Sequence, residues 1–357
     1  MARRLKTDAW LFGATLLLVA TGVAWVFSAA GESALLMQVL WIALGGVGLY
    51  VAMNVDYKKY NEPKILGALI GLTLFGLVVV FFFPRINGSH RWIRFGDLGL
   101  QPSEFAKLVV ILFGAATIGR KLEAREALEP AFARTLVLAS AFCALVFLEP
   151  DAGSAAMIIG LAAAMIFVAG LPYKWVAAAA LVAPVLGYVA LVAAGYRAER
   201  IAAFFSSTPD PFGQDYQPRQ ALIAVGSGGW LGKGFMSGIQ RHGFLPEAHN
   251  DYIYAVISEE KGLLGAAFVL LCFAVIVWRG LRVARRAPDA FGSLVAVGIT
   301  TFIGLQALFN ISVVLKLVPP KGIPLPFVSK GGSSMLVCLL AMGVLLNISQ
   351  QASATDA

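Results

Sequence analysis

Long apolar stretches separated by short polar segments dominate the chain, and ten of them approach the length needed to cross a bilayer. They cover residues 9–30, 34–53, 64–84, 104–119, 131–149, 152–171, 174–194, 255–278, 291–314 and 333–349. A helix of about 20 residues spans a hydrocarbon core of roughly 30 Å. The stretches are continuously apolar and do not alternate with period two, which argues against a β-barrel. The pattern predicts an all-α polytopic integral membrane protein with about ten transmembrane helices.

Composition agrees with a protein that uses the bilayer as its solvent. Of the 357 residues, 59% are hydrophobic and only 13% are charged, and the mean hydropathy is +0.79. The basic start followed by the apolar stretch 9–30 resembles a secretory signal. That stretch is long enough to span, and more spans follow, so we expect a retained first helix. The three cysteines show no CxxC spacing, so neither a disulfide framework nor a thiolate metal site is indicated.

The charge pattern predicts the orientation of the chain. An even number of spans places both termini on one side, and a cytoplasmic N-terminus puts most loop lysines and arginines in the cytoplasm, as the positive-inside rule requires. The opposite side then carries residues 85–103, 195–254 and 318–334. The segment 195–254, between the seventh and eighth spans, is far longer than an ordinary connection and therefore predicts a functional extracytoplasmic loop. No internal repeat is visible, so residues 1–357 are expected to form one integral domain.

Several basic residues break the positive-inside rule. The net charge is +8, but the basic residues lie in short loops between apolar stretches, so we expect no nucleic-acid partner. The exceptions on the outer side that are candidates for binding an anion are Arg91, Arg197, Arg200, Lys233 and Arg241. Guanidinium groups bind anionic oxygens in a bidentate manner, so these residues predict an anionic ligand outside the membrane, although a solvated loop charge is the alternative for each.

Two familiar motifs are absent. The glycine-rich segment 226–234 fails the P-loop pattern, because Ser227 replaces the first glycine and Gly234 replaces the Ser or Thr after the lysine. There is no HExxH motif, and the three histidines lack metal-ligand spacing, so no transition-metal site is expected.

Three polar segments carry a family resemblance. The first joins Gly88-Ser-His-Arg-Trp-Ile93 to Gln101-Pro-Ser-Glu-Phe-Ala-Lys-Leu108. The second runs from Arg200 through Ser207–Gln217 and Gln220–Gly229 to Phe244-Leu-Pro-Glu-Ala-His-Asn-Asp-Tyr-Ile-Tyr254. The third is Pro320-Lys-Gly-Ile-Pro-Leu-Pro-Phe-Val-Ser329 with Gly331-Gly-Ser-Ser334. Together they resemble the SEDS family of FtsW, RodA and SpoVE, with FtsW slightly favoured over RodA. Lys330 departs from the family's usual tyrosine.

The resemblance implies a peptidoglycan glycosyltransferase of the bacterial cytoplasmic (inner) membrane. Such an enzyme polymerises lipid II into β-1,4 glycan strands at the outer face, with undecaprenyl diphosphate as leaving group and inversion at the anomeric carbon. The implied partners are lipid II, the undecaprenyl-diphosphate-linked glycan, a class B penicillin-binding protein as transpeptidase, and other divisome or elongasome membrane proteins. No cofactor is certain, but the resemblance allows a divalent cation, Mg²⁺ or Mn²⁺, at the diphosphate.

Asp251 is the expected catalytic carboxylate. The reaction needs a base for the acceptor hydroxyl and cations for the leaving diphosphate. Asp251 follows a Pro-Glu-x-His-Asn lead-in at a membrane boundary, where partial desolvation can raise the pKa of a carboxyl group. The resemblance places the family's essential aspartate at this position. The alternative is that Asp251 only caps the eighth helix.

Further residues are candidates for substrate binding. Glu104 and Lys107 are three apart at the start of a predicted helix and can pair on one face, either as a structural salt bridge or in contact with substrate. Arg91 and Arg200 fall within the matching motifs and are the preferred diphosphate ligands. Glu247 and His249 can orient the acceptor or tune Asp251, and the third motif adds Lys321 and Ser329.

The glycines and prolines of 318–334 predict non-helical backbone beside a cavity, with a plain extracellular turn as the alternative. Two other functions remain open: a transporter that flips lipid II, and a non-catalytic scaffold of the division or elongation machinery. A flippase explains a cavity but not the outward-facing carboxylate segment, and a scaffold leaves the loop acids without a task.

Overall fold

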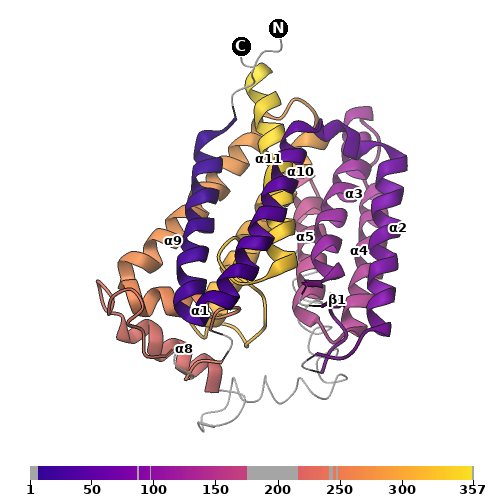
Figure 1. Cartoon of the computed structure of the whole chain (residues 1–357). Coiled ribbons are helices and arrows are strands. Elements are labelled where there is room, and N and C mark those ends of the chain that lie inside the picture. Colours follow the sequence, from indigo (N-terminus) through magenta and orange to yellow (C-terminus); the bar gives the residue numbers. More distant parts are fainter. Residues whose placement is uncertain are drawn as a thin grey trace.

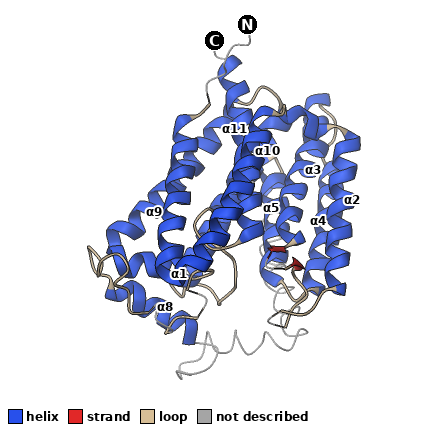
Figure 2. Cartoon of the chain, viewed as in Figure 1, coloured by secondary structure: helices blue, strands red, loops and turns tan. Residues whose placement is uncertain are grey.

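The protein is a bundle of long helices with one short β-hairpin (Figures 1 and 2). The computed structural model describes residues 7–86, 88–96, 98–174, 216–240, 244–246 and 248–355. The long helices are α1 (Ala9–Asn54), α2 (Pro63–Val79), α3 (Pro102–Ala124), α4 (Glu129–Leu148), α5 (Ala152–Val168), α9 (Ile253–Arg286), α10 (Ala290–Val314) and α11 (Gly332–Thr355). The shorter elements are η1 (Tyr57–Asn61), η2 (Val80–Phe82), β1 (Ile93–Phe95), β2 (Leu98–Leu100) and α8 (Tyr216–Ser227). Strands β1 and β2 pair antiparallel, with Ile93 opposite Leu100.

Helix α1 is a helical hairpin that contains the first two predicted spans. Its 46 residues are interrupted at Gly31, whose φ of 75° and ψ of −166° are not helical. Glycine reaches this region without a Cβ clash, so the chain can reverse there. Both ends of α1 then meet neighbouring positions of α11: Asp8 donates its backbone N–H to Ser349, and Tyr57 donates its own to Asn347. Figure 1 shows the two halves running down and back beside α11.

The described helices correspond to nine of the ten predicted spans, with the first two spans joined in α1. Six helices of the described residues are long and apolar enough to cross a membrane, and α5 is a shorter apolar helix. The remaining span, 174–194, lies outside the described residues except for Lys174. The count of ten therefore stays a prediction, whereas the helical polytopic class is confirmed.

Helix α9 extends beyond the apolar stretch that predicted it. Helix α9 continues to Arg286, eight residues past the predicted end at 278. Arg285 and Arg286 occupy its last turn, where positive charge interacts favourably with the helix dipole and the exposed carbonyls. Hydropathy therefore marked the membrane-embedded part of this helix and not its full length.

The two termini lie together at one end of the bundle (Figure 1). Gln350 donates a hydrogen bond to Thr7 at 2.9 Å, and Arg279 bonds Asp8. Lys58 and Asp289 approach to 3.7 Å at the same end. The described ends of the chain therefore lie together, and the side of the membrane that they occupy stays a prediction.

The segment between α10 and α11 passes into the bundle. Residues 318–331 have no helix or strand, as the loop colouring in Figure 2 shows, yet Ile323, Leu325, Phe327 and Val328 are buried. A Cβ added to Gly22 of α1 would meet the carbonyl oxygen of Val328 at 2.7 Å. Gly22 lies nine residues from the turn of α1 at Gly31, about 13 Å along the helix. The prediction of non-helical backbone inside the protein is confirmed, and a plain surface turn is wrong.

Candidate functional site

Asp251 lies at the start of α9, against the inserted segment 318–331. A Cβ added to Gly322 would come within 2.8 Å of the Asp251 Oδ2 atom. The carboxylate therefore occupies space that any side chain at position 322 would fill. The N-cap of α9 is Tyr252, and no side chain makes a cap hydrogen bond there. The partly exposed side chain of Asp251 faces the inserted segment. The catalytic role of Asp251 stays a prediction, with capping of the eighth helix as its alternative.

Two amides of α10 hold this arrangement together. Asn310 donates from its Nδ2 to the backbone oxygen of Asp251 at 2.8 Å and to that of Ile323 at 2.7 Å. One turn earlier, Gln306 donates from its Nε2 to the Pro324 oxygen at 3.0 Å and to Ser334 at 3.2 Å. Both amides are buried, where an unmade hydrogen bond is costly. Helix α10 thus fixes the positions of the start of α9 and the inserted segment relative to each other.

Glu104 and Lys107 form the predicted pair on the first turns of α3. Lys107 Nζ lies 2.7 Å from Glu104 Oε1, and the side chains are 1% and 3% exposed. Lys107 also donates to Gln306 Oε1 at 2.9 Å and lies 5.0 Å from the ring centre of Phe302. Glu104 Oε2 is buried without a hydrogen-bond partner. The ion pair is therefore connected through Gln306 and the inserted segment to the region of Asp251.

Arg91 lies with two carboxyl groups at the turn between α4 and α5. It donates to the Pro150 oxygen at 2.5 Å and approaches Asp151 Oδ2 to 4.0 Å. Asp151 accepts from Ser154 at the start of α5 and from Gln101 before α3. Glu149 is fully buried, and neither of its carboxyl oxygens has a hydrogen-bond partner. Burial, and then the neighbouring Asp151 charge, raise the pKa of Glu149 to about 8, although Arg91 opposes the shift.

The remaining predicted site residues divide into three groups. His249 is bonded to the inserted segment, because its backbone oxygen accepts from Lys330 N at 3.0 Å. Ser329 lies within that segment, where its Oγ accepts from Leu325 N at 2.8 Å. Lys321 is the partly exposed neighbour of Gly322 in that segment. Lys233 is paired with the buried Glu259 at 2.7 Å, which gives it a structural partner within the protein. Arg197, Arg200, Arg241 and Glu247 lie outside the described residues.

Sequence reasoning missed Gln306, Asn310, Glu149 and Asp151. A signal was present for the amides, because Gln306 and Asn310 are the two side-chain amides of an apolar helix and lie four apart on one face. Glu149 is the last residue of a predicted span and Asp151 follows it, so the sequence alone indicates an ordinary polar turn there.

A divalent cation bound by the protein would need several ligands from the chain. Within the described ranges, no group of three or more His, Cys, Asp or Glu residues is placed to hold a metal ion. The cation therefore stays a prediction.

The fold and these buried polar contacts define a polytopic helical membrane protein with a polar site at the end of the bundle opposite the termini. A family model for FtsW, RodA and SpoVE, described as cell cycle protein, matches residues 7–354. The chain belongs to this family.

Named relatives cover nearly the whole chain. Stage V sporulation protein E of Bacillus subtilis is 37% identical, over 98% of this chain and 98% of its own. The probable peptidoglycan glycosyltransferase FtsW of Geobacter metallireducens is 37% identical, over 94% and 92%.

Two solved structures share the fold. A chain of a peptidoglycan synthase complex, described as coordinating polymerization and crosslinking, superposes with a TM-score of 0.81 at 25% identity and covers 98% of this chain and 99% of its own. The rod shape determining protein RodA of Thermus thermophilus gives a TM-score of 0.72 at 24% identity, over 97% and 98%.

Proposed function

We propose that this protein is a peptidoglycan glycosyltransferase that polymerises lipid II, with Asp251 as its catalytic base. The observation that carries the proposal is the position of the Asp251 carboxylate, beside Gly322 of a buried non-helical segment. The same segment is tied by Gln306 to the Glu104–Lys107 pair. The named FtsW relatives support the reaction class.

The proposed step is an inverting displacement at an anomeric carbon. The 4-hydroxyl of the terminal N-acetylglucosamine of an incoming lipid II attacks carbon 1 of the growing glycan. A new carbon–oxygen bond forms, the bond from carbon 1 to the diphosphate breaks, and undecaprenyl diphosphate leaves. Asp251 accepts the hydroxyl proton, which is general-base catalysis and contributes typically about 10²–10⁴-fold to rate.

Other residues of the chain would bind and orient the substrates. Lys107 of α3 and Arg91 beside the turn between α4 and α5 carry positive charge, and charge of this sign stabilises a leaving diphosphate. We propose Glu104, His249, Lys321 and Ser329 as further contacts, and the same role for Arg200 and Glu247. A divalent cation, Mg²⁺ or Mn²⁺, would have to be bound largely by the diphosphate itself, because the described residues supply no three-ligand set.

The cellular setting follows from the charge pattern and the relatives. We propose the bacterial inner membrane, with the termini in the cytoplasm beside the basic residues and Asp251 outside. A chain of similar fold belongs to a peptidoglycan synthase complex, which supports a class B penicillin-binding protein as transpeptidase partner.

The test is glycan polymerisation from labelled lipid II by the purified protein, alone and with a cognate transpeptidase. Asp251→Asn keeps the side-chain size but removes the base, so we expect the rate to fall by about 10²-fold or more. Asp56→Asn is the matched control, since Asp56 is exposed at the opposite end and should leave the rate unchanged.

Each alternative function predicts a different result in the same preparation. Polymerisation by folded Asp251→Asn at the wild-type rate would overturn the assignment of the base. Lipid II translocation without polymer from any form would favour a flippase, and neither activity with intact partner binding would favour a scaffold.

A further inference from the structure

Helix α9 is broken near its start, and a loop of the extracytoplasmic segment satisfies the break. Gly262 has φ 62° and ψ −158°, so the helical hydrogen bonds around it are interrupted. Residues 228–234 supply the replacements. Leu263 N donates to the Gly229 oxygen at 2.8 Å and Leu264 N to the Trp230 oxygen at 3.3 Å, while Lys233 N and Gly234 N each donate at 3.0 Å to the oxygens of Glu259 and Glu260. Broken helices persist at membrane depth only where such partners exist.

The buried carboxylate of Glu259 binds the rest of this loop. Glu259 accepts from Ile239 N at 3.0 Å and from Gln240 N at 3.2 Å, besides its ion pair with Lys233. Lys233 is the one charged residue in 229–240, and its charge is neutralised by this pair. The loop therefore has a fixed conformation and no unpaired charge.

Most of the exposed side chains of this loop are large and apolar, the polar exceptions being Lys233 and Ser237. Trp230 is 74% exposed and Leu231 is 75% exposed. Three more large apolar side chains of the same loop are exposed: Phe235, Met236 and Ile239. A soluble loop rarely displays such a contiguous apolar patch, and patches of this kind mark contact with a membrane or a protein.

The hydrogen bonds place this patch at the edge of the lipid. Leu263 and Leu264 begin the uncharged run 262–278 of α9, which is 17 residues or about 26 Å long, close to the thickness of a hydrocarbon core. Both leucines are exposed, as is Leu270 farther along the helix. Because residues 229 and 230 bond directly to 263 and 264, Trp230 and Leu231 lie level with the outer end of the span. Tryptophan is enriched at this interface.

We propose that residues 229–239 form a membrane-inserted loop, whose apolar side chains enter the bilayer leaflet on the side of Asp251. The occupant of the patch is lipid, because the patch continues the exposed surface of a spanning helix. The inserted loop would fix the depth of the segment that follows it, and therefore the depth of Asp251, relative to the membrane surface. A lipid-linked substrate approaches Asp251 from that surface. That last consequence rests on the proposed function, whereas the insertion itself does not.

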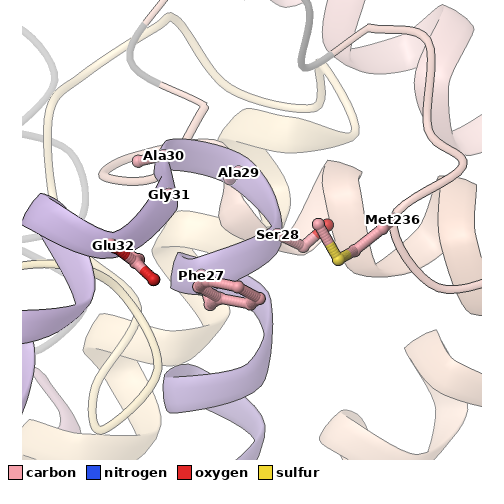
Figure 3. A pocket seen from close by; sticks show the side chains of 7 residues that line it. All are labelled: Phe27, Ser28, Ala29, Ala30, Gly31, Glu32 and Met236. Atoms are coloured by element: carbon pink, nitrogen blue, oxygen red, sulfur yellow. The ribbon is translucent and has the colours of Figure 1, made fainter.

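A cavity beside the loop opens at the same level. Met236 faces Ser28 and the turn of α1 across a space of about 400 Å³ that is also lined by Phe27, Gly31 and Glu32 (Figure 3). Ser28 Oγ donates to Glu260 Oε1 at 2.6 Å, which ties the α1 turn to the break in α9. The loop and the α1 turn therefore form one connected surface at this end of the bundle.

Depth-resolved quenching tests the insertion without any assay of activity. The full chain with Cys143→Ala, which leaves Cys272 and Cys338 buried, carries one new cysteine labelled with the environment-sensitive dye NBD. The label is placed by Leu231→Cys, or by Ile239→Cys as a second position, in liposomes of phosphatidylethanolamine and phosphatidylglycerol. Lipids with a shallow nitroxide and aqueous iodide are the two quenchers. Leu270→Cys on α9 is the lipid-facing control, and Arg94→Cys on the β-hairpin is the aqueous control.

We expect labels at 231 and 239 to be quenched by the nitroxide lipid and to be at least about threefold less accessible to iodide than the label at 94. Iodide quenching equal to that at 94, without nitroxide quenching, would overturn the proposal. A label that is quenched by neither agent would mean that protein, for example a second copy of this chain, covers the patch. That result would also overturn the proposal. Unlabelled Leu231→Cys should retain wild-type thermal stability, which separates loss of insertion from misfolding.

Discussion

Glu104 and Lys107 are buried together in α3, and their charges depend on each other. Removing one partner of a buried ion pair leaves an uncompensated charge and costs about 3–5 kcal/mol. We therefore expect Lys107→Met to lower the thermal unfolding temperature strongly, and Glu104→Gln/Lys107→Met to recover most of it. Unfolding in detergent measures both variants.

Polymerisation by the same variants separates the two roles of the pair. If Lys107 contacts substrate, the double variant regains stability but not rate. Recovery of both would reduce the pair to a structural bridge that fixes α3, and additive losses of stability would show that the two charges are not coupled.

Glu149 gives the folded protein a pH dependence of known sign. The pKa of its carboxyl rises from an ordinary 4.5 to about 8 on folding. Between these two pH values, the carboxyl is protonated in the folded state and ionised in the unfolded chain. Stability falls with rising pH wherever the folded state binds more protons. Protonated Glu149 therefore contributes to the free energy of unfolding. We expect this contribution to be fully present below pH 4.5, to be lost as the pH rises toward 8, and to stay lost above pH 8.

The measurement is the unfolding temperature of wild type and Glu149→Gln from pH 4.5 to 8.5. The variant is neutral throughout, so its stability should decline less across that range. Parallel curves for the two proteins would show that Glu149 ionises normally despite its burial.

In helix α9, the conformation of one residue, Gly262, breaks the helix. Gly262 adopts a positive φ, and a Cβ there would meet Gly232 N at 2.5 Å and the Trp230 carbonyl carbon at 2.6 Å. Gly262→Ala is therefore expected to destabilise the protein by about 1–3 kcal/mol, as strained backbone does. Gly67→Ala in α2 is the matched control, because that helical glycine has open space around it and alanine should stabilise the helix by about 0.5–1 kcal/mol.

Thermal unfolding compares these two glycine variants. Equal tolerance of alanine at 262 and 67 would contradict the broken geometry of α9 and, with it, the attachment of the loop 228–234.

Across the whole molecule, two buried asparagines perform the same task at opposite ends. Asn310 joins Asp251 to the inserted segment, whereas Asn347 joins α1 to α11 near the termini by accepting from Tyr57 N and donating to the Met53 oxygen. Each substitution by leucine leaves backbone groups unsatisfied, at about 1–3 kcal/mol per group. We expect both variants to lose stability, but only Asn310→Leu to lower the polymerisation rate of the folded fraction.

The comparison uses rate per folded molecule, with the folded fraction taken from size-exclusion chromatography. A comparable loss of rate in Asn347→Leu would mean that activity follows overall stability, and that the Asp251 end is not a distinct functional region.

The sequence by itself determined the class of this protein and the pairing of Glu104 with Lys107. Continuous apolar stretches predict membrane helices because lipid leaves the backbone no other hydrogen-bond partner, and the spacing of Glu104 and Lys107 predicts a pair because helical geometry is local. The glycines and prolines of 318–334 also predicted backbone that enters the bundle. These inferences need only neighbouring residues and the nature of the solvent. The choice of Asp251 came instead from the family resemblance and stays a prediction.

Tertiary structure decided what depends on contacts between distant segments. It joined Asp251 to residue 323 through Asn310, buried Glu149 beside Asp151, and paired Lys233 with Glu259. It also placed the Asp251 carboxylate beside Gly322 of the inserted segment. Burial and hydrogen bonding at these positions arise where helices pack together, so they are fixed by the fold and cannot be read from spacing along the chain.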